Sequence, residues 1–130
     1  NPNHVIGDFG CGEAIIYEKF PNRTVRSFDH VAIGKHVESC NITERTSLEN
    51  KSIDIAIFCL SLMGRDWKKM LEEADRCLYN GGKIMIVEHN NQLDNRLSEL
   101  KEVIRTLGTG YAETRYETIG QFTFIEAEKL

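Results

Sequence analysis

The sequence predicts an α/β domain with a mostly parallel sheet. Short apolar segments alternate with helical patterns along the 130 residues, which is typical of strand–helix–strand units. The strongest apolar run, residues 55–60, is continuous rather than alternating, and this favours a strand covered on both faces, as in the middle of a parallel sheet. Right-handed crossovers in such a domain place a ligand cleft at the carboxyl ends of the strands.

The first half of the chain contains most of the expected parallel strands. We expect strands at residues 5–9, 24–28, 36–42 and 53–60, with a polar turn at residues 49–52 before the last of them. A short helix is expected at residues 13–20, and Pro21 marks its end.

The second half begins with an amphipathic helix at residues 66–78, whose apolar positions recur at three- and four-residue spacings. We expect Asn80-Gly81-Gly82 to terminate this helix, since glycine accepts the left-handed geometry of a helix end. A buried strand at residues 83–88 and a helix at residues 93–107 follow. Residues 111–118 and 121–128 alternate polar and apolar positions and predict a closing antiparallel hairpin around Gly120.

Composition narrows the class of protein. Hydrophobic residues make up 41% of the chain, charged residues 28%, and the net charge is −4. No apolar run approaches the ~18 residues of a membrane helix, so we expect no membrane association. The acidic balance means that any RNA contact comes from a local patch or another segment. The four cysteines form no close pair, which predicts no structural metal site. Three of them lie in or beside apolar runs, which predicts reduced, buried thiols in an intracellular protein. Because the chain lacks an initiator Met, we interpret residues 1–130 as one domain of a longer protein.

The sharpest local signal is Asp8-Phe9-Gly10-Cys11-Gly12, between an expected strand and an expected helix. Glycines there let the backbone approach a ligand, and the helix start offers free amide donors. A dinucleotide-binding loop has a third glycine where this chain has Ile15, which disfavours NAD. The Asp8 carboxylate suits an ammonium group better than a phosphate. The combination predicts a cofactor with an amino-acid end, S-adenosylmethionine, bound through Asp8, Gly10 and Gly12.

Three further strand ends carry candidate ligand contacts. Asp29 ends the second expected strand, where a carboxylate can accept hydrogen bonds from both ribose hydroxyls; taken alone it is equally well a surface turn residue. Asn41 and Ile42 end the third, where an amide can bond the adenine edge and an apolar side chain can pack on the ring. Residues 58–64 leave the strongest strand as the floor or rim of a cleft.

Together, Asp8 to Gly12, Asp29 and above all Phe-Cys-Leu-Ser-Leu-Met-Gly at residues 58–64 resemble the ribosomal RNA-processing protein 8 family, also called nucleomethylin. The resemblance extends through residues 71–76, 81–83, Glu88 and the final hairpin, nearly the whole chain. The glycine loop is shared by many methyltransferases, whereas residues 58–64 are much more specific to this family.

The resemblance implies a Rossmann-like class I methyltransferase, with a mostly parallel seven-stranded sheet and an antiparallel last strand. It implies methylation of an adenine ring nitrogen, N1, in large-subunit ribosomal RNA in the nucleolus, with chromatin or ribosome-assembly proteins as partners. The implied cofactor contacts are Gly10, Asp29, Asn41, Ile42 and Cys59. The family usually has Asp-Met in place of Asn41-Ile42, and small and basic residues in place of residues 89–92.

No residue has a compelling catalytic signature, because the adenine ring nitrogen already carries a lone pair and methyl transfer to it needs no strong base. Glu88 and His89, at the exit of a strand, are candidates to orient the target base or take up a proton; a solvated turn histidine is the alternative for His89. The stripe Trp67, Met70 and Leu71 indicates core packing rather than a base-stacking platform.

Two basic spots, Lys68-Lys69 and Lys101 with Arg105, are diluted by acidic neighbours and are typical of solvated helix faces. Two further functions stay open at this point. One is a non-catalytic S-adenosylmethionine- or partner-binding module linked to ribosomal RNA or chromatin, which the acidic balance and Asn41 favour. The other is methylation of a small molecule or a protein, which shares the fold.

Overall fold

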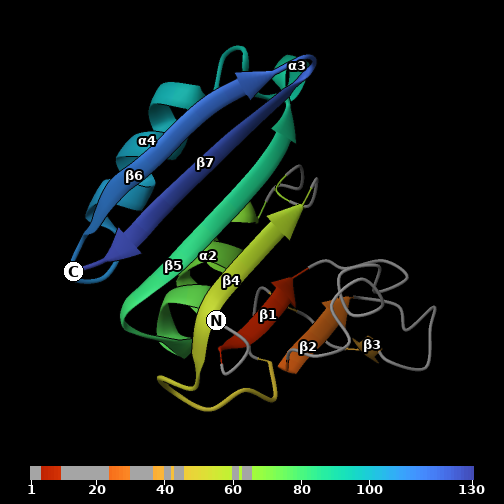
Figure 1. The fold of residues 1–130 in the computed structure, drawn as a ribbon, viewed down its shortest axis with the longest axis vertical. Coiled ribbons are helices and arrows are strands. Elements are labelled where there is room, and N and C mark those ends of the chain that lie inside the picture. The colour runs from red at the N-terminus through yellow and green to blue at the C-terminus, as the bar shows by residue number, and fades with distance from the viewer. Residues whose placement is uncertain are drawn as a thin grey trace.

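In the computed structural model, the residues described are 4–9, 24–29, 37–39, 42, 46–59, 62 and 66–130. They contain one seven-stranded sheet in the order β3-β2-β1-β4-β5-β7-β6 (Figure 1). The strands are β1 Val5–Phe9, β2 Thr24–Asp29, β3 Val37–Ser39, β4 Ile53–Cys59, β5 Leu78–His89, β6 Tyr111–Ile119 and β7 Phe122–Lys129. The helices are α2 Trp67–Cys77, α3 Asn90–Leu93 and α4 Leu97–Thr106. The helix expected at residues 13–20 lies outside the described residues.

The direction of the strands confirms the predicted architecture. Strands β3, β2, β1, β4 and β5 run parallel to one another, and β7 is antiparallel to both β5 and β6. The chain runs outward from β1 through β2 to β3 and then returns to β4 on the other side of β1. The strand order therefore reverses between β1 and β4, and their carboxyl ends point to the same edge of the sheet (Figure 1). Parallel α/β sheets bind ligands at such a reversal.

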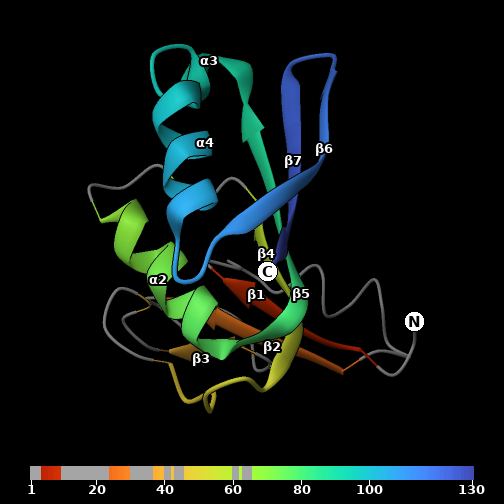
Figure 2. The ribbon, with the colours of Figure 1, turned by 90° about the vertical axis from the view of Figure 1, so that its left-hand side faces the viewer.

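Helices α2 and α4 lie on the same face of the sheet (Figure 2). Their apolar stripes face the core, which includes Trp67, Leu71, Leu100 and Ile104. Trp67 and Leu71 are thus core residues, as predicted from their helical spacing. Packing these apolar stripes against the sheet removes apolar surface from water, which holds the two helices in place.

The buried layer next to the carboxyl edge is aromatic. Phe9, Phe28 and Phe58, from three adjacent strands, are fully buried. The ring of Phe9 stacks against both others, with centroid distances of 5.7 Å to Phe28 and 5.2 Å to Phe58. Offset stacking adds to the free energy of apolar burial. This layer fixes β2, β1 and β4 relative to one another at the end of the sheet where the predicted ligand contacts lie.

The expectation that β4 is covered on both faces is only partly correct. Ile53, Ala56 and Phe58 are fully buried, whereas Ile55 and Ile57 are half-buried. Successive side chains of a strand point to opposite faces. Among the described residues, α2 and α4 cover only one of the two faces. A continuous apolar run is therefore compatible with unequal burial of its two sides.

The role expected of the glycines after α2 is wrong. Helix α2 ends at Cys77, and Leu78 already has extended backbone angles and begins β5. Gly81 has φ +83°, in a stretch where the pairing with β4 jumps from Ile53–Leu78 to Ile55–Lys83. The left-handed residue therefore serves a strand irregularity rather than a helix end.

The helix expected at residues 93–107 is divided into α3 and α4. Leu93 ends α3, and α4 begins at Leu97. Leu93 and Leu107 lie outside α4 but are still buried in the core. Their apolar spacing predicted burial correctly, although the residues between them do not form one helix.

The closing hairpin is present as predicted and is tied to α2. Tyr111 Oη donates a hydrogen bond to Asp75 Oδ1 at 2.7 Å, and Lys129 Nζ donates to the carbonyl oxygens of Asp75 and Leu78 at 2.6 and 3.0 Å. Burial and the Asp75 carboxylate strongly raise the pKa of Tyr111, so this phenol stays a donor.

We expect Tyr111→Phe to lower the free energy of unfolding by about 1–2 kcal/mol, because it removes a hydrogen bond to a charged acceptor. Urea denaturation measures the loss. Tyr116→Phe is the matched control, since Tyr116 is exposed and its ring contact with Lys101 survives the change. Equal losses in the two variants would contradict the role given to the Tyr111–Asp75 bond.

A buried carboxylate anchors the segment before β4 to α2. Glu73 Oε2 accepts hydrogen bonds from Thr46 N and Thr46 Oγ1 at 2.6 and 2.8 Å and pairs with Arg76 Nη2 at 2.6 Å. Burial alone would raise the pKa of Glu73, but the hydrogen bonds from Arg76 and Thr46 outweigh it and lower the pKa.

A lowered folded-state pKa means that Glu73 stabilises the fold above its unfolded pKa and loses this contribution as pH falls through its folded pKa. We therefore expect the difference in free energy of unfolding between the unmodified chain and Glu73→Gln to be largest near neutral pH. The difference should shrink as pH falls below about 4. Denaturant titrations over a pH series measure it, and a difference independent of pH would contradict the assignment.

Candidate functional site

Three of the predicted site residues lie near the carboxyl ends of three adjacent strands. Asp8 lies near the end of β1, Cys59 ends β4, and Glu88 lies near the end of β5. Burial raises the pKa of the Cys59 thiol, and the nearby carboxylates of Asp8 and then Glu88 raise it further. The thiol therefore lies within electrostatic reach of both carboxylates.

Asp8 has a buried side chain, 2% exposed, next to the reversal of strand order. It pairs in register with Ser27 of β2 and Ile57 of β4. Paired residues of parallel strands share a face of the sheet. Ser27 is also buried, and its Oγ has no hydrogen-bond partner among the residues that the structure describes. Buried polar groups of this kind need partners, and a ligand with polar atoms at this edge would supply them.

Of the other predicted cofactor contacts, only Asp29 and Ile42 lie within the described residues. Asp29 is the last residue of β2, two positions beyond Ser27, and pairs in register with Ser39 of β3. Ile42 is buried and belongs to the core. Gly10, Gly12 and Asn41 lie outside the described residues.

Glu88 holds the backbone of Leu62, three residues beyond the end of β4. Its Oε1 accepts a hydrogen bond from Leu62 N at 3.0 Å, and Arg96 Nη2 donates to Leu62 O at 2.8 Å. Both polar groups of the Leu62 backbone are thus fixed by side chains from other parts of the chain. Burial raises the pKa of Glu88, although the Leu62 amide and the positive charge of Arg96 oppose this.

Two further residues at this edge, Arg96 and Ser27, carry no clear signal in the sequence. Arg96 precedes α4 and reaches Leu62 across 34 positions of sequence, and its guanidinium lies 5.4 Å from the Trp67 ring centroid. A polar residue just before a helix carries no local signal of such a contact. Ser27 is a small polar residue within an expected strand, and such a residue does not by itself indicate a ligand contact.

His89 is packed rather than solvated. Its half-buried ring lies 4.6 Å from the ring of Phe122, centroid to centroid. The next residue, Asn90, joins β5 to the turn between β6 and β7: its backbone N–H donates to Gln121 O, and its side-chain amide donates to Gly120 O. A cavity of about 230 Å³ lies between residues 89–91 and this turn. The interpretation of His89 as a solvated turn residue is therefore wrong.

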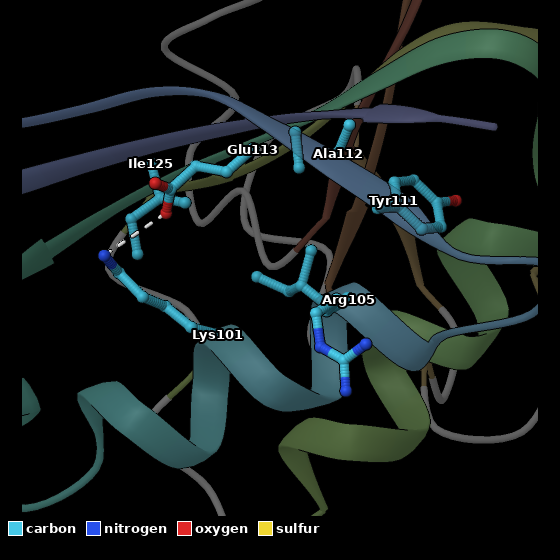
Figure 3. Close-up of a pocket in the computed structure, with 8 residues that line it drawn as sticks. Lys101, Arg105, Tyr111, Ala112, Glu113 and Ile125 are labelled. Carbon is cyan, nitrogen blue, oxygen red and sulfur yellow. Dashed lines mark ion pairs between the residues drawn. The ribbon is translucent and has the colours of Figure 1, made fainter.

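Three of the four basic residues in the two spots form exposed ion pairs, which fits the predicted solvated helix faces. Lys68 pairs with Glu99 at 2.7 Å, Lys101 with Glu113 at 3.3 Å, and Arg105 with Glu102. Lys101 and Arg105 line a groove of about 340 Å³ between α4 and the closing hairpin, and Figure 3 shows the Lys101–Glu113 pair across it. The groove has paired charges and does not include the strand ends that carry Asp8, Cys59 and Glu88.

The two cysteines that the structure describes differ in exposure. Cys77 is fully buried among core residues, as expected, whereas Cys59 is exposed, which corrects its interpretation as a buried thiol. Within the described ranges, no cluster of three or more His, Cys, Asp or Glu side chains is placed to hold a metal ion. None of the described helices combines the length and apolar character of a membrane span.

The fold and the placement of these residues define a Rossmann-like domain of the class I methyltransferase type. The chain is similar in structure to a solved S-adenosylmethionine-dependent methyltransferase from Methanosarcina mazei, with a TM-score of 0.78 and 15% sequence identity. The match covers 100% of this chain and 94% of the other. Residues 1–130 match the sequence model of a family described as "Hypothetical methyltransferase". The chain belongs to this methyltransferase family.

Curated relatives confirm the resemblance to ribosomal RNA-processing protein 8. The protein of that name from Drosophila melanogaster is 35% identical over 97% of this chain and 34% of its own length. The "25S rRNA (adenine(645)-N(1))-methyltransferase" of Schizosaccharomyces pombe is 41% identical over 75% of this chain and 31% of its own length. The chain therefore spans about a third of the length of these relatives.

Proposed function

We propose that the protein carrying this domain transfers a methyl group from S-adenosylmethionine to ring nitrogen N1 of an adenine in large-subunit ribosomal RNA. The observation that carries this proposal is the placement of Asp8, Cys59 and Glu88 near the carboxyl ends of three adjacent strands, next to the reversal of strand order, with Cys59 in electrostatic reach of both carboxylates. The activity for which the Schizosaccharomyces pombe relative is named supports the choice of substrate.

The residues at this edge fit the cofactor that we propose. Asp8 offers negative charge to the ammonium group, and Asp29 at the end of β2 offers a bidentate acceptor to the ribose hydroxyls. The loop with Gly10 and Gly12 would admit the backbone close to the methionine end. Asn41 and Ile42 would contact the adenine ring, and Cys59 would lie beside the cofactor. The buried hydroxyl of Ser27, which has no partner among the described residues, gives this edge a further polar atom for a ligand.

The protein's part in the reaction is positioning. S-adenosylmethionine supplies a methyl group on a sulfonium, and the adenine nitrogen supplies its own lone pair, so the chain needs no strong base. Orienting the two reactants and excluding water are worth several orders of magnitude in rate. Glu88 and His89 lie at the end of β5. In the sheet, β1 and β4 separate this strand from β2, which carries the proposed ribose contact Asp29. We place the adenine that accepts the methyl group on the β5 side.

RNA binding and location belong to the same proposal. The net charge of −4 and the paired lysines and arginines of α2 and α4 favour RNA contacts made by other parts of the protein. The names of the relatives support a nuclear, nucleolar site of action. Ribosome-assembly or chromatin proteins are the partners that we propose there.

Mass spectrometry of ribosomal RNA nucleosides tests this function directly. Loss of the gene should remove 1-methyladenosine from large-subunit RNA, and the full-length protein should restore it, whereas a variant with Asp29→Ala should not. Unchanged 1-methyladenosine would contradict the proposal. Binding of S-adenosylmethionine without transfer to RNA would favour a non-catalytic module instead, and transfer only to a small molecule or protein would favour another methyltransferase function.

A further inference from the structure

Glu88 has an unusual arrangement for a residue that only holds a neighbouring backbone. It is 1% exposed, and its Oε1 is engaged by Leu62 N. Its Oε2 is buried with no hydrogen-bond partner within the described part of the chain. An unpartnered buried polar atom costs free energy, and a neutral glutamine would accept the same Leu62 hydrogen bond without burying a charge. The carboxylate must therefore be explained by something other than the Leu62 contact.

The sheet order places Glu88 on the acceptor side of the site. The proposed cofactor contacts Asp29 and Asp8 are on β2 and β1, and β4 and β5 follow in that order. Neighbouring strands are about 4.8 Å apart, so β5 lies about 10 Å from β1. A cofactor held by Asp29 and Asp8 would occupy the ends of β2 and β1, which leaves the ends of β4 and β5 for the group that accepts the methyl.

The charge that moves during methyl transfer makes this position useful. A bond forms between the acceptor nitrogen and the methyl carbon as the carbon–sulfur bond breaks, and the electron pair of the broken bond stays on sulfur. The positive charge passes from sulfur to the base, and no proton leaves the base in this step. A negative charge nearer to the nitrogen than to the sulfur stabilises the product side of the transition state more than the reactant side.

We propose that Glu88 is a positioning residue with an electrostatic role. Its Oε1 fixes the β4 exit segment through Leu62, and its negative charge favours the positive charge that arrives on the acceptor nitrogen. This inference rests on the proposed methyl transfer and assigns a role within it. Arg96 completes the arrangement by holding Leu62 O, so that both backbone groups of Leu62 are fixed on the side of β4 next to Glu88.

Glu88→Gln separates the hydrogen bond from the charge, because glutamine keeps the first and removes the second. The assay is methyl transfer by the full-length protein to ribosomal RNA purified from cells that lack the gene. We expect kcat to fall about tenfold, with the Kd of S-adenosylmethionine and the KM for RNA changed less than about twofold. Glu88→Ala should reduce kcat further and also weaken cofactor binding, because it releases Leu62.

The pH profile of kcat provides a readout that a merely structural role would not change. The titratable and charged groups that face Glu88 are Arg96 before α4, His89 of β5 and Cys59 of β4. Because burial raises the pKa of Glu88, kcat of the unmodified protein should fall as pH drops through that raised value. The Glu88→Gln variant should lack this acidic limb.

Glu73→Gln is the matched control, since Glu73 is also buried but has its carboxylate oxygens engaged by Thr46 and Arg76 in a different part of the fold. It should lower stability and leave kcat and its pH profile unchanged. A Glu88→Gln protein with unmodified kcat and an intact acidic limb would overturn the role of the charge. Absence of any transfer by the unmodified protein would instead overturn the proposed function itself.

Discussion

Replacing Phe58 by alanine should lower the free energy of unfolding by about 3–5 kcal/mol. Phe58 is 0% exposed and stacks on Phe9, which stacks in turn on Phe28. The change would leave a cavity in the aromatic layer that joins β2, β1 and β4 next to the site. Because domains are commonly stable by only about 5–15 kcal/mol, this loss is a large part of the total.

Urea denaturation measures this effect, with Phe124→Ala as the matched control. Phe124 is a half-buried phenylalanine of β7. Its truncation therefore loses less buried apolar surface than that of Phe58, and should cost about 1–2 kcal/mol. Phe58→Leu should cost less than about 1.5 kcal/mol, because it keeps most of the volume. Similar losses for Phe58→Ala and Phe124→Ala would show that the aromatic layer does not organise this end of the sheet.

Replacing Asp29 by alanine should weaken S-adenosylmethionine binding about a hundredfold. The change removes a charged acceptor for two ribose hydroxyls, and hydrogen bonds to charged groups contribute about 1.5–3 kcal/mol each. A loss of about 2.8 kcal/mol corresponds to a hundredfold change in Kd. Asp29→Asn should weaken binding less, because one acceptor oxygen remains. Calorimetric titration of the folded variants gives the three affinities.

Asp54→Ala is the control for loss of an aspartate that is not at the proposed site. Asp54 lies near the start of β4, at the opposite edge of the sheet, where its Oδ2 accepts a hydrogen bond from Val5 N at 2.9 Å. Its replacement should lower stability and leave the Kd unchanged. Equal affinities for Asp29→Ala and the unmodified chain would remove Asp29 from the proposed cofactor site.

The sequence predicted the sheet well because apolar patterning is a local property of each strand, and the alternation of strands with helices indicates parallel pairing. The run in β4 and the alternation in β7 identify strands without knowledge of their partners. Residues 111–119 also form a strand, but every residue of β6 after Tyr111 is exposed, so the alternation expected there is not reflected in burial. The break between α3 and α4 was not predicted, because Leu93 and Leu97 keep helical spacing across it. The bulge near Gly81 depends on pairing with β4, and a glycine beside a helix resembles a helix end.

Part of the site was predictable for a similar reason. Asp8, Cys59 and Glu88 each stand at the end of an expected strand, and parallel strands bring such ends to one edge. The contacts that fix Leu62 were not predictable, since they join residues 26 and 34 positions apart. Their existence depends on how the chain packs after β4 and β5 are side by side.

Calorimetric titration of S-adenosylmethionine into the folded, unmodified protein is the most direct test of the methyl-donor site at the carboxyl edge. We predict binding of one molecule per chain, with heat that is strongly reduced by Asp29→Ala and retained by Asp54→Ala. A folded protein that takes up no S-adenosylmethionine, or that binds it equally well without the Asp29 carboxylate, would contradict the proposed site.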